Sequence, residues 1–196
     1  MNFPLRQPGD EPPRTLPLTA RSFLALAGSG ALDEIEGRIE LISGTMTIAP
    51  PPGGSHQRAE RRLLAAVFEA LFRHGAQGRL TVQTSGGLEL DRETLVSPDL
   101  MVVSNRDHDG VWQPGDVVLL VEVAQSSLSL DLGSKADLYA AAGIQDYWVM
   151  AVDAQEIVIH RNPHEGRYRT TLTLSATEKA TALLEPALSF AVAGLF

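Results

Sequence analysis

The sequence has no cysteine and no long apolar run. Without cysteine the chain cannot form disulfides or thiolate metal sites, which fits a cytoplasmic protein. A membrane helix needs roughly 18 consecutive apolar residues, and the longest candidate, LLAAVFEALF, is interrupted by charge. The N-terminal segment MNFPLRQPGDEPPRTLP lacks the basic-then-apolar order of a secretory signal. We therefore expect a cytoplasmic protein with no membrane segment.

Basic residues are also scarce, with 16 Lys and Arg against 24 Asp and Glu and a formal net charge of -8. Proteins that coat nucleic acid without sequence preference are usually basic, so the charge counts against that role. It counts less against a metal-dependent nuclease, because the carboxylates that hold Mg²⁺ are themselves acidic. The sequence contains no P-loop, dinucleotide fingerprint, Ser-His-Asp order or zinc motif.

The length of 196 residues, 44% of them hydrophobic, suits one globular domain. Residues 1–17 are rich in proline and charge and show no periodicity, which predicts a flexible N-terminal arm before a single domain over 18–196. The polar stretch NRDHDG, residues 105–110, reads as a surface loop.

Hydrophobic periodicity and turn residues predict the elements of this domain. In order, they are a helix capped by Thr19 and ending near Gly28; a hairpin over 38–50 that turns at Ser43-Gly44; a helix from Ser55 to Gly75; strands over 80–83, 87–90, 98–104 and 117–123; a helix over 131–143; and strands over 144–152, 156–161 and 167–174. This order predicts an α/β fold in which helices flank a mixed central sheet, with an N-terminal helix and a β-hairpin.

Two carboxylates occupy strands that should be buried. Glu122 lies within VVLLVEVA and shares a face with Leu120 and Ala124 by alternation, so it needs a cation, a proton or a cage of hydrogen bonds. Asp99 follows Pro98 at the start of another apolar strand. Two carboxylates at the same end of adjacent strands can bind a hard cation such as Mg²⁺.

A lysine on the following helix completes the group. Leu132, Lys135, Ala136 and Tyr139 are spaced i, i+3, i+4 and i+7, which predicts that Lys135 faces the sheet. A purely structural Glu122–Lys135 ion pair explains the same pattern. The three charged residues together favour a functional site.

These residues stand in the order PD, then an apolar strand with Glu, then Lys, which resembles the PD-(D/E)xK nuclease superfamily with its restriction-endonuclease-like fold. More closely, the chain resembles the Uma-type endonuclease family of bacteria from about Ile39 to the C-terminus. The motifs that carry the likeness are IELISGTM, APPPGGSHQRAERRL, SPDLMVV, VVLLVEVAQSS, DLGSKADLYAAAGIQDYWVM and LSFAVAGLF, and the DLGSKADLYAAAGIQDYWVM stretch is the most specific.

The resemblance implies roles for five residues. Asp99 and Glu122 would bind Mg²⁺ or Mn²⁺, with Glu40 as a further acidic ligand, and His56 would touch metal, water or phosphate or else simply cap a helix. Lys135 would replace the superfamily lysine, because Ala124 stands where the E-x-K pattern has it. The chain departs from the family at Ser43, Gln125 and Ser126, which places substrate fit in question more than metal binding.

Three arginines at the start of the long helix, Arg58, Arg61 and Arg62, could contact the phosphates of nucleic acid, or simply form a solvated helix face. The resemblance thus implies a Mg²⁺-dependent endonuclease that cuts DNA as a homodimer, with Lys135 assisting the attacking water or the transition state. The alternative is a catalytically silent nuclease-fold protein that serves as a binding or assembly module. A small-phosphoester hydrolase is a third hypothesis.

Overall fold

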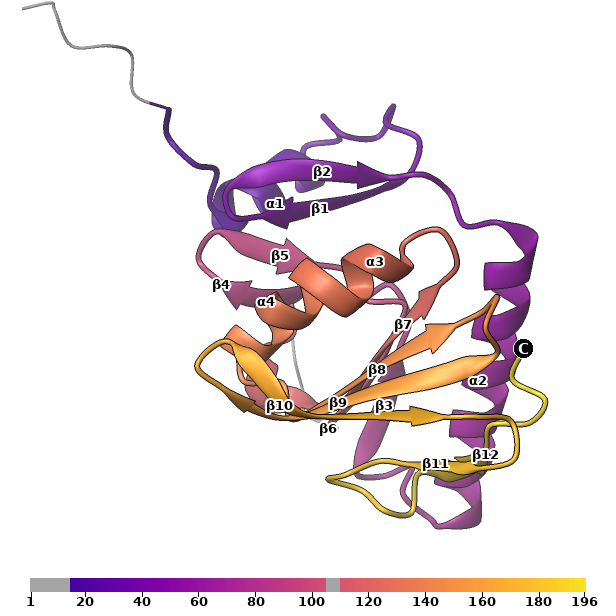
Figure 1. Cartoon of the computed structure of the whole chain (residues 1–196). Coiled ribbons are helices and arrows are strands. Elements are labelled where there is room, and N and C mark those ends of the chain that lie inside the picture. Colours follow the sequence, from indigo (N-terminus) through magenta and orange to yellow (C-terminus); the bar gives the residue numbers. More distant parts are fainter. Residues whose placement is uncertain (1–14, 105–109) are drawn as a thin grey trace, which may run out of the picture.

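The computed structural model describes residues 15–104 and 110–196 and forms a mixed sheet with helices on both faces (Figure 1). The predicted arm therefore lies outside the described residues up to position 14, and the loop predicted over 105–110 is described only at Gly110. Pro17 packs against the hairpin turn so closely that a side chain at Gly44 would overlap it. Ser43 and Gly44 both have positive φ, the conformation that a two-residue hairpin turn needs.

The central sheet has the strand order β10-β9-β8-β7-β6-β3. Its strands are β3 (Leu80–Gln83), β6 (Leu100–Ser104), β7 (Val117–Ala124), β8 (Asp146–Ala151), β9 (Glu156–His164) and β10 (Arg167–Leu174). The pair β7–β8 is parallel and the other pairs are antiparallel, so the predicted mixed sheet is confirmed. β7 and β8 are buried almost throughout because helices cover both faces of the sheet.

A smaller antiparallel sheet in the order β2-β1-β5-β4 stands beside the central one. It contains β1 (Arg38–Ile42), β2 (Thr45–Ala49), β4 (Leu88–Asp91) and β5 (Thr94–Val96), and β11 (Lys179–Thr181) pairs with β12 (Ser189–Ala191) near the C-terminus. Helix α1 (Ala20–Gly28) covers the small sheet, where Phe23 packs with Leu41 and Leu95. β5 was not predicted, because three residues are too few to show a period.

Helix α2 (Gly54–Arg73) covers one face of the central sheet through Ala59, Leu63, Val67 and Leu71, as its periodicity predicts. The prediction that Ser55 caps it was wrong. The helix begins at Gly54, and the Ser55 hydroxyl instead accepts a hydrogen bond from Arg58. None of the helices in the described ranges has the length and apolarity needed to cross a bilayer.

The crossover from β7 to β8 covers the other face of the sheet (Figure 1). It consists of α3 (Leu128–Leu130), a widened π-helical turn η2 (Asp131–Lys135) and α4 (Ala136–Ala141), with a kink at Gly133. The predicted single helix over 131–143 was therefore wrong at its start and in its regularity. Lys135 and Tyr139 are buried as predicted, but Leu132 is exposed because the kink shifts the helical phase before it.

Candidate active site

Asp99 and Glu122 lie side by side where β6 begins and β7 nears its end. The backbone N–H of Asp99 donates to Glu122 Oε2 at 3.3 Å, and the N–H of Val123 donates to Asp99 Oδ2 at 2.7 Å. The register explains this contact, because Leu100 pairs with Val121 in the antiparallel ladder. Both side chains are buried, so two neighbouring acidic groups are largely removed from water.

Lys135 connects this pair to the small sheet. Its ammonium group lies 3.0 Å from Glu122 Oε1 and 3.2 Å from Glu40 Oε2, and the residue is only 3% exposed. Glu40, on β1, also accepts a hydrogen bond from the N–H of Ser97 at 2.8 Å. Tyr139 donates its hydroxyl hydrogen to Glu122 Oε1 at 2.7 Å. The structure thus brings together four of the five predicted catalytic residues through direct contacts.

Burial governs the protonation of this pair. Desolvation raises the pKa of Glu122 to about 7, although the Lys135 ammonium acts in the opposite direction. For Lys135, burial alone would lower the pKa, but the carboxylates of Glu122 and Glu40 raise it above its ordinary value. Lys135 is therefore cationic at neutral pH, beside a carboxyl group whose pKa burial has raised.

Arg38, at the start of β1, is a member of the site that was not predicted. Its guanidinium donates to Asp99 Oδ1 at 2.5 Å, and its side chain is 30% exposed. Burial would raise the pKa of Asp99, but the nearby His56 imidazole and the charge of Arg38 hold it well below its ordinary value. The spacing Arg38–Glu40 places both side chains on one face of a strand, and that alternation was the available signal.

His56, in the first turn of α2, is the fifth predicted residue. Its Nε2 lies 3.7 Å from Asp99 Oδ1, and the interaction with that carboxylate raises the pKa of the imidazole. Glu60 lies one helical turn further along, half-buried, and burial raises the pKa of its carboxyl group. His56 is thus a charged or chargeable partner of Asp99 rather than a simple helix cap.

A cavity of about 500 Å³ opens onto this group. Its walls are the segment 50–53 between β2 and α2, the loop 125–127 after β7, and the side chains of Arg38, His56, Glu60 and Asp99. Glu40, Glu122 and Lys135 are not among the lining residues and lie behind Asp99. A molecule in the cavity would therefore meet Asp99, Arg38 and His56 first.

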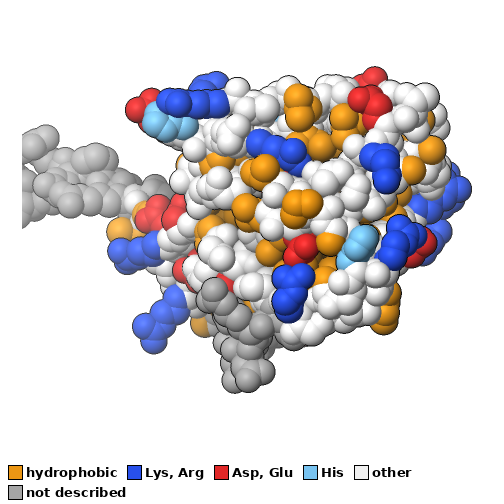
Figure 2. Space-filling view, turned by 90° about the horizontal axis from the view of Figure 1, so that it is seen from below, with side chains coloured by type: hydrophobic (Ala, Val, Ile, Leu, Met, Phe, Trp, Pro, Cys, Tyr) orange, Lys and Arg blue, Asp and Glu red, His pale blue; other side chains and the backbone are white. Residues whose placement is uncertain are grey.

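The three arginines near the start of α2 lie apart from this cavity. Arg58, Arg61 and Arg62 are exposed and lie outside the cavity lining. Figure 2 shows the end of the molecule that carries β11 and β12, where Lys and Arg side chains lie among hydrophobic and acidic ones. A role of Arg58, Arg61 and Arg62 in DNA binding stays a prediction.

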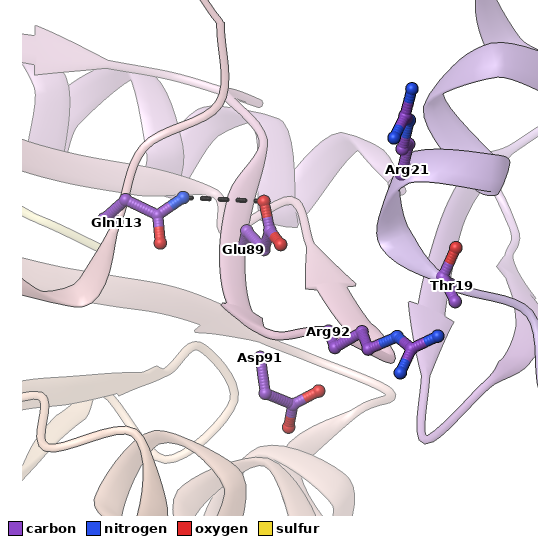
Figure 3. A pocket seen from close by; sticks show the side chains of 6 residues that line it. All are labelled: Thr19, Arg21, Glu89, Asp91, Arg92 and Gln113. Carbon is purple, nitrogen blue, oxygen red and sulfur yellow. Dashed lines mark hydrogen bonds between the residues drawn. The ribbon is translucent and has the colours of Figure 1, made fainter.

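A second cavity, of about 430 Å³, lies at the junction of α1, the β4–β5 turn and Gln113 (Figure 3). Its lining mixes the cations Arg21 and Arg92 with the acids Glu89 and Asp91, and Gln113 donates to Glu89 at 3.5 Å. There Glu89 accepts from the amide of Gln113 and Asp91 accepts from the backbone N–H of Glu93. The group around Asp99 is therefore the better candidate for chemistry.

The donor set around Asp99 fits a hard cation in its chemistry. Mg²⁺ is commonly held by one or two carboxylates while retaining several waters, and Asp99 and Glu122 supply two carboxylates beside a cavity. Among the described residues, no three His, Asp or Glu side chains converge as a metal group. A cation would therefore need water ligands, and it would have to share or replace the partner that Asp99 now has in Arg38.

The structure is an α/β protein with a mixed sheet, an acidic pair on adjacent strands and a lysine on the crossover between β7 and β8. Residues 21–193 match the family Uma2, described as "Putative restriction endonuclease", and the chain belongs to this family. The crystal structure of a "putative nuclease belonging to DUF820" from Anabaena variabilis ATCC 29413 is similar, with a TM-score of 0.70 and 16% identity over 92% of this chain and 98% of that one. That likeness shows the fold, and no curated protein matches the chain.

Proposed function

We propose that the chain is a divalent-metal-dependent endonuclease that hydrolyses phosphodiester bonds of DNA. The observation that carries this proposal is the contact between Asp99 and Glu122 on adjacent central strands, beside a cavity and backed by the Lys135 ammonium. Membership of a family described as restriction endonucleases supports the same class of reaction. Asp99 and Glu122 would hold Mg²⁺ or Mn²⁺, and a bound ion would polarise the phosphodiester and activate a water molecule.

The chain's own residues have distinct tasks in this proposal. The Val123 N–H fixes Asp99 on the cavity wall, while Lys135 and Tyr139 orient Glu122. The Lys135 charge favours the ionised form of Glu122 and offsets negative charge that develops on the phosphate in the transition state. His56 lines the cavity beside Asp99, where it can hold a proton or a phosphate oxygen.

Glu40 takes a supporting task rather than a place in the cation's coordination. Among the described residues, Glu40 contacts the N–H of Ser97 and the ammonium of Lys135, whereas Asp99 and Glu122 contact each other. Glu40 therefore positions Lys135 between two carboxylates. The ligand role that the resemblance implies for Glu40 gives way to this one in our proposal.

The direct test is nicking of supercoiled plasmid DNA with Mg²⁺ or Mn²⁺, with and without a chelator. We expect wild-type protein to nick, and Asp99→Ala to lose at least about a hundredfold of the rate, because a cation ligand on the cavity wall is gone. Asp137→Ala, which removes a half-exposed acid on α4, is the matched control and should cut normally. Intact plasmid under every metal condition with wild-type protein would refute the proposal.

Coordinated cutting of both strands of a duplex uses two active sites, so we infer that the proposed enzyme is a homodimer. We place the enzyme in the cytoplasm. Light scattering coupled to gel filtration measures the mass directly. A strictly monomeric protein that still makes double-strand breaks would remove the dimer from the proposal.

One observation favours a second candidate, a catalytically silent nuclease-fold binding module. All four carboxylate oxygens of Asp99 and Glu122 already accept hydrogen bonds from protein donors. This candidate expects no Mn²⁺ binding in calorimetry. Tight Mn²⁺ binding that disappears in Glu122→Gln would eliminate it.

A further inference from the structure

The acidic group has two internal cations, and they are held very differently. Lys135 is 3% exposed and lies between Glu40 and Glu122, with oxygens of both within 3.3 Å of its ammonium. Among the described residues, Asp99 alone forms an ion pair or hydrogen bond with the Arg38 side chain, and about a third of that side chain is exposed on the cavity wall. Of the two cations, Arg38 is therefore the one that can move without leaving two buried carboxylates unpaired.

The oxygen that Arg38 contacts is also the one that faces outward. Asp99 Oδ2 is fixed by the N–H of Val123, whereas Oδ1 meets Arg38 and lies 3.7 Å from His56, and both of these residues line the cavity. A cation entering from the cavity reaches Oδ1 first. A cation bound at Oδ1 would lie close to the guanidinium, and the repulsion between the two positive charges opposes their sharing this oxygen.

We propose that Arg38 competes with the divalent cation for Asp99 Oδ1 and that, once released, its guanidinium binds a phosphate oxygen of the substrate in the same cavity. The inference rests on the proposed function. β1 is fixed by its pairing with β2 along Arg38–Ile42, so a released side chain stays over the cavity. The planar guanidinium of arginine binds phosphate oxygens as well as carboxylate oxygens, so Arg38 can exchange one partner for the other.

A purely structural Arg38–Asp99 pair predicts the opposite change in Mn²⁺ affinity when Arg38 is removed. If Arg38 only orients Asp99, its removal should weaken binding of a cation. If Arg38 competes, its removal should strengthen cation binding and weaken binding of phosphate. Mn²⁺ affinity without DNA therefore separates the two roles without reference to cleavage.

The experiment is calorimetry with Mn²⁺ alone on wild-type protein, Arg38→Gln and Arg169→Gln. We expect Arg38→Gln to bind Mn²⁺ about three- to tenfold more tightly, the scale of one charged hydrogen bond lost to the competitor. Arg169→Gln removes the same charge from an exposed position on the edge strand β10, outside the cavity lining, so its Mn²⁺ affinity should stay within about twofold of wild type. Equal or weaker Mn²⁺ binding by folded Arg38→Gln would overturn the inference.

The second measurement is affinity for a short DNA duplex in Ca²⁺, which occupies oxygen sites without supporting rapid cleavage. Arg38→Gln should bind the duplex about three- to tenfold more weakly than wild type and than Arg169→Gln. Arg38→Lys keeps the charge and protects the fold but lacks the fork of donors, so it should also bind the duplex more weakly. Unchanged duplex affinity in both Arg38 variants would refute the phosphate role.

The outcomes also distinguish this inference from the proposed nuclease activity. Wild-type protein that binds Mn²⁺ but never nicks DNA would refute the nuclease while the Mn²⁺ comparison still decides the role of Arg38. Wild-type and Arg38→Gln proteins that both fail to bind Mn²⁺ would refute both proposals. Thermal unfolding of each variant verifies that the compared proteins are folded.

Discussion

The Lys135 ammonium lies 3.0 Å from Glu122 Oε1, and the two residues are 13 positions apart on a helical crossover and a central strand. In the E-x-K pattern the lysine would stand at position 124 of the same strand, where this chain has Ala124. Glu122 and Ala124 share a face of β7, and Lys135 approaches that face from the crossover above it. The Lys135 ammonium thus reaches the Glu122 carboxylate from the crossover and not from β7 itself.

Removal of the lysine charge should destabilise the protein. Lys135→Met leaves Glu122 and Glu40 buried without their cation, and breaking a buried pair in this way costs about 3–5 kcal/mol. Urea unfolding measures the change, and Lys179→Met, at an exposed position, should change stability by less than about 0.5 kcal/mol. The double variant Glu122→Gln with Lys135→Met should lose less than the sum of the single changes, so additive losses would contradict a direct pair.

The Tyr139 hydroxyl should stabilise the fold through Glu122. Tyr139→Phe removes a hydrogen bond to a charged, buried acceptor, which costs about 1.5–3 kcal/mol. Tyr168→Phe is the matched control, because the buried Tyr168 hydroxyl has no hydrogen-bond partner among the described residues, and its removal should be neutral or stabilising. Equal losses of stability in the two variants would show that the hydroxyl of Tyr139 has no special partner.

The backbone at Gly37 should resist substitution, since it positions Arg38. Gly37 has φ +122°, and a side chain there would overlap the carbonyl oxygen of Ala49 on β2. Gly37→Ala should therefore cost about 1–3 kcal/mol. Gly28→Ala, at the end of α1 with open space around it, should be neutral or stabilising by up to about 1 kcal/mol, and a similar loss at both positions would contradict the role of strain.

His160 should make the stability fall on acidification. The His160 ring stacks on Tyr147 and packs against Tyr168, and burial lowers the pKa of its imidazole below 6.5. The unfolded chain then binds a proton below pH 6.5 that the folded chain does not, so the contribution to stability is present above that pH and lost as the pH falls through the lower folded-state pKa.

The variant His160→Phe cannot take up this proton. Its free energy of unfolding should therefore fall less steeply below pH 6.5 than that of wild-type protein, by at most the limit of about 1.4 kcal/mol per pH unit for one proton. Parallel stability curves for the two proteins, measured by urea unfolding at successive pH values, would contradict the buried neutral imidazole.

The sequence by itself determined the elements whose pattern is local. Alternation placed Glu122 on the face of Leu120 and Ala124, helical spacing placed the α2 positions Leu63 and Val67 in the core, and Ser43-Gly44 fixed the hairpin turn. Each of these features follows from a period or a turn conformation that a few neighbouring residues specify. The resemblance to the nuclease family rested on the order of the acidic and basic residues along the chain, and the family match over 21–193 confirmed it.

Only the tertiary structure decided which charges meet and which of them face the cavity. Arg38 contacts Asp99 across 61 positions of sequence, because β1 pairs with β5 and the chain runs from β5 through Asp99 into β6, and no local pattern encodes that pairing. The kink at Gly133 likewise set the phase that exposes Leu132 and buries Lys135. Long-range packing also placed Glu40, Glu122 and Lys135 behind Asp99, which leaves Asp99 and Arg38 as the pair that an incoming molecule meets.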